Sequence, residues 1–215
     1  MIDFPITLIV KHLLLGLGWT AGLSLIAFVL GGIVGLLTLL ARISDNKFLR
    51  ILSKAYIEFF QGTPLLMQLF LIFFGIGLLG SDISPLLAAT IGLTLFTSAY
   101  LAEIWRGSVE SITTGQWEAA DSLAMSRYQQ MRFVILPQAL RISIPPTVGF
   151  SVQVVKGTAV TSIIGFMEIT KTGSMIANAT FQPLLVYSLV AVGYFMLCFP
   201  LSVYSRHIER SIGCR

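Results

Sequence analysis

The sequence predicts an all-α integral membrane protein with five transmembrane helices in a single domain, 1–215. Of its 215 residues, 55% are hydrophobic and only 11% are charged, and the mean hydropathy is +0.86. A soluble domain carries roughly 25% charged residues, so a chain this poor in charge could not cover a surface facing water. The charged residues also gather in clusters that separate long apolar runs.

Five apolar runs are long enough to cross a hydrocarbon core of about 30 Å, which needs about 20 helical residues. They cover roughly 13–40, 59–81, 83–104, 142–167 and 184–204. The first run is longer than the apolar core of a signal peptide, typically about 7 to 15 residues, so we expect it to stay in the protein as a span.

Two pairs of glycines lie four residues apart in the first run, Gly18 with Gly22 and Gly31 with Gly35. Small residues at this spacing let helix backbones approach closely in lipid. A dinucleotide-binding loop would need a preceding strand, and the surroundings here are entirely apolar. The glycines therefore predict close helix packing.

The cationic residues predict the orientation of the spans. One side of the membrane would carry Arg42, Lys47, Arg50, Lys54, Arg106, Arg127, Arg132, Arg141, Arg206, Arg210 and Arg215. The other side would carry only Lys11 and Lys171. The positive-inside rule places the N-terminus outside and the C-terminus in the cytoplasm, which agrees with an odd number of spans.

A polar segment, 106–145, separates the third and fourth spans, and its middle reads GQWEAADSLAMSRYQQMRFVILPQALRISIPP (115–146). A first short helix is predicted by the helical spacing of Trp117, Ala120, Leu123 and Ala124.

A second short helix is predicted to begin at Ser126. The Ser126 hydroxyl can cap it, and the Gln129 side chain, three residues later, can bond back to the backbone of Ser126 in a capping box. Its apolar stripe is Met131, Val134 and Ile135. Pro137 is expected to end or turn this helix, because the proline ring removes a helical donor. The pair Pro145 and Pro146 is expected to mark the return into the fourth span.

Two interpretations of this segment remain open. It could be an amphipathic linker held at the lipid headgroups by its arginines. It is long for a structureless connection, however, and the small residues Ala119, Ala120 and Ala124 suit insertion into the groove of a partner better than contact with lipid.

Polar residues inside the spans are candidates for a solute path, since ionisable groups in a membrane usually face an interior cavity. Lys156 is the strongest, because Gly157 and Thr158 follow it and could loosen the helix. It could contact a substrate carboxylate or a gate, or equally pair with a neighbouring helix. Further candidates are Gln68, Thr94, Thr97, Ser98 and Thr158, although the hydroxyls on the third span could equally bond to nearby backbone.

The other ionisable groups do not indicate a catalytic or metal-binding site. Glu58 and Glu103 lie near predicted cytoplasmic ends, where pairing with Arg106 or the basic first loop is expected. His12 and His207 fall on opposite sides of the membrane, and no metal site, catalytic triad or paired carboxylate can be assembled. No G-x-x-x-x-G-K-[ST] phosphate loop is present, and a net charge of +4 does not indicate nucleic acid.

From Glu118 onward, the polar segment resembles the EAA signature of binding-protein-dependent ABC importer permeases: E-A-A, three residues, a small residue, nine residues, then I-x-L-P. The matching positions are Glu118, Ala119, Ala120, Ala124, Val134, Leu136 and Pro137. Ala124 stands where the family usually has glycine, which allows less freedom at the bend, and Val134 stands where it has isoleucine.

Three further segments resemble the polar amino acid subfamily (His, Glu, Gln, Arg and opine permeases), and GQWEAA, beginning at Gly115, is typical of it. They are FFQGTPLLMQLF (59–70), SAYLAEIWRG (98–107) and KGTAVTSIIG (156–165). Gln61 replaces the usual arginine, Gly157 an acid and Ala159 a serine.

The resemblance implies a type I ABC importer fold in a bacterial cytoplasmic (inner) membrane. It also implies a second permease chain, identical or homologous, two separate ATPase subunits that use ATP and Mg, and an extracytoplasmic binding protein that delivers an amino acid. The cytoplasmic segment would dock into the ATPase through Gly115, Glu118, Ala119, Ala120, Ala124, Leu136 and Pro137, while this chain itself would bind no cofactor and catalyse no reaction.

Two other classes of protein remain as alternatives. An ion-coupled secondary transporter or channel would be expected to show internal repeats or matching broken helices, and no convincing repeat is found. A membrane scaffold or sensor without transport activity is the third possibility.

Overall fold

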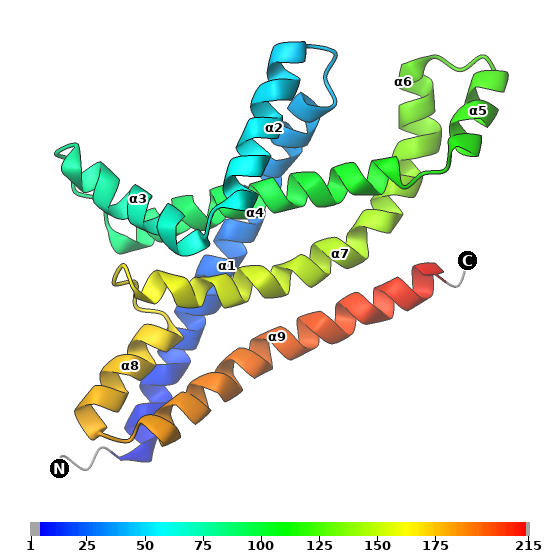
Figure 1. The fold of residues 1–215 in the computed structure, drawn as a ribbon. Helices are drawn as coiled ribbons and strands as arrows, with labels where there is room; N and C mark the ends of the chain where they lie inside the picture. The colour runs from blue at the N-terminus through cyan, green and yellow to red at the C-terminus, as the bar shows by residue number, and fades with distance from the viewer. Residues whose placement is uncertain (1–4, 214–215) are drawn as a thin grey trace.

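The computed structural model describes residues 5–213, so Arg215 lies outside the described part of the chain. The described residues form helices and loops without a β-strand (Figure 1). The helices are α1 (Ile6–Arg42), α2 (Lys47–Gly62), α3 (Leu65–Leu78), α4 (Pro85–Glu110), α5 (Thr114–Ser122), α6 (Arg127–Gln129), a π-helical stretch (Gln130–Ile135), α7 (Leu136–Gly157), a 3-10 stretch (Thr158–Ser162), α8 (Ile169–Thr180) and α9 (Pro183–Gly213).

Among the described residues, four helices are each long and apolar enough to cross a membrane: α1, α4, the continuous run Arg127–Ser162, and α9. A fifth span is reached if α2 and α3, which meet at 105°, count as one broken crossing. The helical class and the span count therefore agree with the sequence prediction. The predicted boundaries need correction: α1 begins earlier, α4 and α9 end later, and the second and fourth spans differ more deeply.

The single helix expected over 59–81 is wrong, because the chain bends between α2 and α3. Pro64 supplies no backbone donor, and it holds the preceding Thr63 in an extended conformation (φ −115°, ψ 143°). The basic segment expected to be a loop after the first span forms the first half of α2, which Asn46 caps by accepting from the Phe48 N–H.

The predicted fourth span, 142–167, is displaced. Its helix begins at Arg127, passes through Pro145 and Pro146, and ends at Ser162. α9 contacts the helix at this point, where the Ser205 hydroxyl donates to the Pro145 carbonyl at 2.8 Å. Proline is tolerated inside membrane helices when neighbouring helices and local adjustments support the interrupted backbone.

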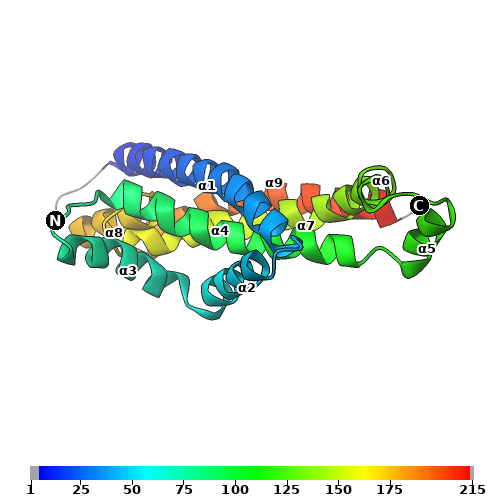
Figure 2. The same cartoon turned by 90° about the horizontal axis from the view of Figure 1, so that it is seen from above.

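α4 lies at the centre of the fold, packed between α1, α2, α3 and α7 (Figures 1 and 2). Tyr100 projects from α4 and stacks on Phe150 of α7 with ring centroids 5.2 Å apart. The main core lies between these elements and includes Leu69, Leu93 and Leu101, all without solvent exposure.

Gly31 and Gly35 bring α1 against α4, as their spacing predicts. A Cβ atom at Gly31 would lie 2.6 Å from the Thr97 Cβ, and one at Gly35 would lie 3.0 Å from the Ser98 carbonyl oxygen. Neither position can accept a side chain without movement of a helix. Gly18 and Gly22 face open space within this chain, so the packing prediction is confirmed only for the second pair.

We expect Gly31→Ala to destabilise the α1–α4 contact by about 1–3 kcal/mol, because the added methyl overfills a packed interface. Gly18→Ala is the matched control, since nothing lies within 4 Å of its added methyl. Thermal unfolding of the detergent-solubilised protein measures both. Equal melting temperatures for the two variants would contradict the packing that we describe.

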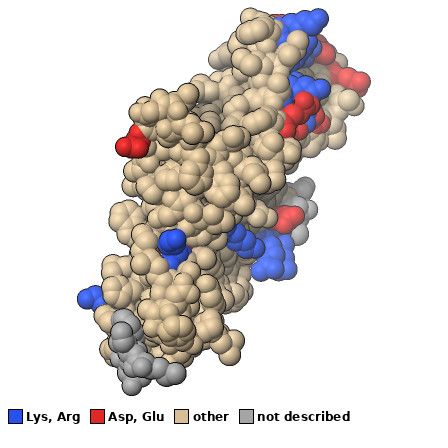
Figure 3. Space-filling view, turned by 60° about the vertical axis from the view of Figure 1, so that its left-hand side comes forward, with Lys and Arg blue, Asp and Glu red and all other residues tan. Residues whose placement is uncertain are grey.

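The two ends of the molecule differ in charge. The α5–α6 hairpin and the end of α9 lie at one end, and α8 and the beginning of α1 lie at the other (Figure 2). Most of the face in Figure 3 is free of charge; its Lys, Arg, Asp and Glu atoms form a cluster at the upper right and a second group at mid-height on the right, with a few isolated groups elsewhere. This distribution fits a molecule whose middle lies in lipid.

Candidate coupling hairpin and translocation path

The predicted polar segment folds into a hairpin, which we define as residues 111–139. α5 packs against the beginning of the long helix Arg127–Ser162, around a small apolar cluster. The cluster consists of Val109, Ile112, Trp117, Met131, Val134, Ile135 and Ala139. The apolar stripe predicted for the second helix is thus confirmed, and it forms the core of the hairpin.

Polar side chains fasten the hairpin in addition. The buried Gln130 donates from Nε2 to the Met125 carbonyl at 2.9 Å and to the Asp121 carboxylate. The predicted capping box is confirmed, since Ser126 accepts from the Gln129 N–H and the Gln129 side chain accepts from the Ser126 N–H at 2.8 Å. These contacts make the hairpin a built unit rather than a loose linker.

Ala124 adopts a left-handed backbone conformation with φ of 53°. It follows the end of α5, where the Met125 N–H donates to the Ala120 carbonyl and the Ala124 N–H donates to the Asp121 carbonyl. This is the Schellman arrangement, in which glycine is favoured because it has no Cβ. The bend that the sequence places at Ala124 is confirmed, together with its strain.

We expect Ala124→Gly to stabilise the hairpin by about 0.5–1 kcal/mol, because relief of the left-handed strain exceeds the added entropy of the unfolded chain. Slower hydrogen exchange of the Met125 amide would show it. Ala119→Gly is the control, since Ala119 lies within α5, and glycine there should speed exchange by costing about 1 kcal/mol. Faster exchange in Ala124→Gly would contradict the prediction.

The prediction that Pro137 ends the second helix is wrong. The helix continues through it, and the residues just before the proline, Gln130–Ile135, wind as a π-helix. The widened π-helical turn changes the hydrogen-bond register just before the proline and lets the helix pass through it. Beside the proline, Gln138 Nε2 donates to the Val134 carbonyl at 2.8 Å and to the Gln116 side-chain oxygen of α5 at 3.2 Å, which ties the two arms of the hairpin together.

The hairpin presents an exposed surface to potential partners. Gly115, Glu118 and Ala119 are exposed on α5, and Leu136 and Pro137 are exposed on the second arm. Large apolar side chains join them: Leu123, Tyr128 and Phe133 are 75%, 74% and 64% exposed. Ala120 is the exception among the predicted coupling residues, because it is buried in the hairpin.

Two of the predicted path residues support the bent pair α2–α3 and its contact with α4. Gln68 is buried, and its Nε2 donates to the carbonyls of Phe60 and Thr63 at 2.9 and 3.0 Å, where α2 ends. Ser98 lies 2.6 Å from the Tyr56 hydroxyl. These contacts give both residues a structural task at the bend.

The remaining hydroxyls of the predicted path are also buried. Thr158 donates to the Val155 carbonyl at 2.7 Å. Thr94 and Thr97 are 9% and 0% exposed, and their hydroxyl oxygens have no partner among the described residues. The expectation that nearby backbone would satisfy the hydroxyls of this helix is therefore met by Ser98, which donates to the Leu95 carbonyl at 2.8 Å, and not by the two threonines.

Lys156 lies apart from that set. It is exposed on α7 and lines a groove of about 390 Å³ between α7 and α9. No carboxylate of the described residues lies within salt-bridge distance of it. The expected pairings of Glu58 and Glu103 are confirmed, since Glu58 meets Lys54 at 3.6 Å and Glu103 accepts from Arg106 Nε at 2.9 Å.

Glu168, whose side chain is fully buried, was not predicted from the sequence as a functional or structural residue. Its carboxylate caps α8 by accepting from the N–H groups of Thr170 and Lys171 at 2.8 and 2.7 Å, and it accepts from the Tyr194 hydroxyl at 2.8 Å. A glutamate just before a polar helical segment could have been recognised as a cap. The predicted fourth span ends at residue 167, so the prediction places Glu168 directly after a membrane helix and not as the cap of a new helix.

This arrangement of membrane helices with a projecting hairpin matches a known family. The family model for binding-protein-dependent transport system inner membrane components matches residues 27–213. The chain belongs to this family.

Relatives of this permease carry the names of amino acid transport proteins. The probable amino-acid ABC transporter permease protein YckA of Bacillus subtilis is 35% identical over 93% of this chain and 88% of its own length. The L-cystine transport system permease protein TcyB of B. subtilis is 36% identical over 92% and 85%. The glutamine transport system permease protein GlnP of Escherichia coli is 34% identical over 91% and 90%.

Solved structures agree on the fold. A chain from the crystal structure of an amino acid ABC transporter with histidines superposes with a TM-score of 0.90, at 33% identity over 94% of both chains. The inward-facing MetNI methionine ABC transporter superposes at 0.73 with 23% identity, which supports the fold alone. This chain is thus the inner-membrane permease subunit of an amino acid ABC importer, a system in which the ATPase is a separate subunit.

Proposed function

We propose that this permease moves polar amino acids inward across the membrane, driven by a separate ATPase that grips the hairpin. The observation that carries the proposal is the hairpin itself, a packed and capped unit that presents exposed apolar side chains and a carboxylate without an ion pair among the described residues. Exposed apolar groups on a water-facing projection favour burial against another protein.

Glu118 is the proposed polar anchor of that contact. It is exposed on α5, and no ion pair holds it among the described residues. A cationic side chain of the ATPase could donate a charge-assisted hydrogen bond to it, which is stronger than a neutral one. The small residues Gly115, Ala119 and Ala124 leave the surface beside it open to a close approach, Leu136 and Pro137 extend the contact on the second arm, and Ala120 packs inside the hairpin.

The proposed orientation places the hairpin and the C-terminus in the cytoplasm and the N-terminus outside. The hairpin end carries most of the cationic residues, as the positive-inside rule requires.

The proposed transport cycle is driven at the ATPase. ATP binding, with Mg bound at the ATPase, would bring the two ATPase subunits together and rotate the hairpins, so that the path opens to the outside. ATP hydrolysis would return the path to its inward-facing state.

The proposed assembly contains a second permease chain, identical or homologous, two ATPase subunits and an extracytoplasmic binding protein, in a lipid bilayer and without nucleic acid. One chain encloses little space for a solute, so the path would run between two permeases. Lys156, Gln68, Thr94, Thr97, Ser98 and Thr158 remain the proposed residues along it, with Lys156 the most accessible of the set.

Reconstitution tests the proposal. Proteoliposomes that contain the permease, its ATPase and its binding protein should take up a polar amino acid when ATP is supplied, and vanadate should stop the uptake. Uptake that an ionophore abolishes and vanadate does not would instead indicate an ion-coupled secondary transporter. Labelling of a cysteine at Ser126 or Gln138 from outside the cell would overturn the orientation.

A further inference from the structure

The last turns of α1 and the first part of α2 form an arm, which we define as residues 34–56. It lies on the opposite side of α4 from α9 (Figures 1 and 2). A groove of about 410 Å³ runs between its two helices. The groove is lined by Val34, Leu37, Thr38 and Ala41 of α1 and by Leu49, Leu52, Ser53 and Tyr56 of α2. The proposed transport path uses none of these residues.

The hydroxyl groups in the groove wall are already bonded. Thr38 and Ser53 donate to carbonyls of their own helices at 2.9 and 3.1 Å. Tyr56 donates to the Leu95 carbonyl of α4 at 3.2 Å. These hydroxyls have no hydrogen left for a polar solute, while a hydrocarbon chain fits such a wall without losing any hydrogen bond. The groove therefore suits an apolar occupant.

Cationic residues surround the end of the groove where the arm turns. They are Arg42, Lys47, Arg50 and Lys54. Two of them, Arg42 and Arg50, directly follow residues of the groove wall. Lys54 meets Glu58 at 3.6 Å, and no carboxylate of the described residues lies within salt-bridge distance of the other three. With Asp45 as the other carboxylate of residues 42–58, this segment keeps a net positive charge.

α2 has the side-chain pattern of a helix that contacts lipid. Beside its cations it exposes large apolar side chains, Phe48, Ile51, Leu52 and Phe59, which are 70%, 57%, 56% and 51% exposed. Exposed apolar residues interleaved with cations are typical of a helix at the membrane interface. The positive-inside rule explains the sign of the charge, but it explains neither these apolar residues nor the groove.

We infer that the groove binds an anionic phospholipid of the cytoplasmic leaflet, with an acyl chain along the groove and the headgroup phosphate at Arg42, Lys47 and Arg50. Clusters of four or more cations directly after a membrane span are the pattern that anionic headgroups bind. A protein seated on the groove would have to bury these cations, which is costly without paired carboxylates. The inference rests on the orientation in the proposed function, and it adds a ligand that the transport proposal does not contain.

Photocrosslinking in a bilayer tests the site. The permease is reconstituted into phosphatidylcholine vesicles that contain a small fraction of phosphatidylglycerol with a photoactivatable acyl chain. A parallel sample carries the same chain on phosphatidylcholine, and mass spectrometry locates the crosslinks. We expect the phosphatidylglycerol probe to label residues 34–41 and 49–56 about ten-fold more than the phosphatidylcholine probe, because each cation near an anionic headgroup contributes roughly five-fold in affinity.

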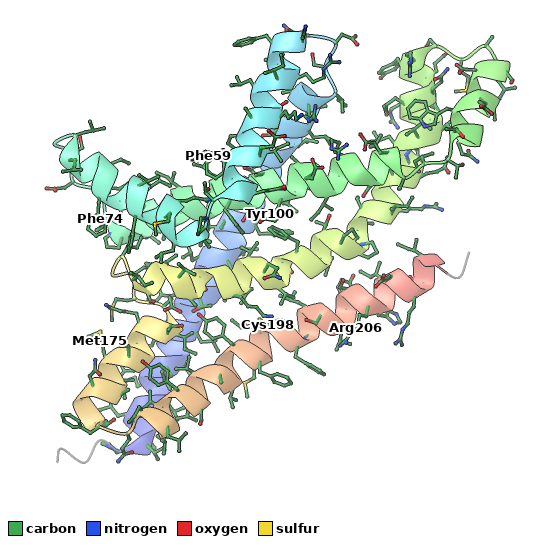
Figure 4. The ribbon with its side chains drawn as sticks, in the orientation of Figure 1. Phe59, Phe74, Tyr100, Met175, Cys198 and Arg206 are labelled. Carbon is green, nitrogen blue, oxygen red and sulfur yellow. The ribbon has the colours of Figure 1, made fainter. Side chains whose placement is uncertain are left out.

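Charge variants make the result specific. Lys47→Gln combined with Arg50→Gln should remove the preference for phosphatidylglycerol, whereas Lys47→Arg combined with Arg50→Lys keeps both charges and should retain it. Both residues are exposed, so the changes remove no packing. The matched control is Arg206→Gln combined with Arg210→Gln, which removes two charges from α9, a helix that lies apart from α2 (Figure 4). This control should keep the preference.

Three results would overturn the inference. Equal labelling by the two probes would show lipid contact without recognition of the headgroup. Absence of crosslinks at both groove segments would show that no lipid occupies the groove, and equal losses in the two double Gln variants would attribute the preference to net charge. The experiment contains no ATPase and no amino acid, so failure of ATP-driven uptake would count against the proposed function and not against the lipid site.

Discussion

Glu168→Gln is expected to destabilise the permease by about 1–3 kcal/mol, the cost of leaving a buried backbone donor without an acceptor. Both carboxylate oxygens accept from backbone N–H groups, Oε1 from Lys171 and Oε2 from Thr170. A glutamine amide has only one oxygen, so its NH₂ must face one of these two donors. The melting temperature of the detergent-solubilised protein measures the loss.

The surroundings of Glu168 explain why the protein cannot relax around the change. α8 begins between α1 and α9: a Cβ at Gly16 would lie 2.9 Å from the Ile169 Cα, and one at Gly193 would lie 2.5 Å from Ile169 Cδ1. The Ile169 N–H also donates to the Thr20 hydroxyl at 3.2 Å. Three helices therefore meet where the carboxylate caps α8.

The controls separate the cap from a general effect of charge removal. Glu209→Gln removes an exposed carboxylate from α9 and should leave the melting temperature unchanged. Tyr194→Phe removes one of the three donors and should have a smaller effect than Glu168→Gln, about 1 kcal/mol. A Glu168→Gln protein as stable as Glu209→Gln would show that the buried cap contributes nothing.

The class of fold was predictable because composition and the spacing of charges report directly on the surrounding solvent. Long apolar runs located the helices α1, α4 and α9, but three of their six ends extend beyond the predicted spans by more than one turn, at the start of α1 and at the ends of α4 and α9. The bend between α2 and α3 was not predicted, because an apolar run shows length and not direction. Thr63 and Pro64 were the available signal, since the residue before a proline disfavours the helical conformation.

Pro137 illustrates the opposite error. A proline is expected to end a helix, but here the helix continues because the residues before it wind as a π-helical turn. Sequence reasoning succeeded at Ser126 and Gln129, where all the interacting groups lie within four residues. It missed Glu168, because the burial of that carboxylate depends on α1 and α9, which are distant in sequence.

Glu118→Arg is expected to abolish ATP-driven uptake while the permease still inserts into the membrane. The substitution replaces an exposed carboxylate on α5 by a cation, so the proposed hydrogen bond from the ATPase becomes a repulsion between like charges. Loss of one such bond is worth about ten-fold in affinity or more, and the reversed charge adds to it. Uptake into proteoliposomes and retention of the ATPase on the immobilised permease measure the effect.

The hairpin should remain folded in this variant, because Glu118 takes no part in the apolar cluster or in the side-chain contacts of Gln130 and Gln138. Glu209→Arg is the matched control, since it makes the same charge reversal at an exposed site on α9 outside the hairpin. Unchanged uptake and ATPase retention in Glu118→Arg would remove the proposed anchor. Equal losses in both variants would attribute the effect to net charge, because only a contact at α5 makes the two positions differ.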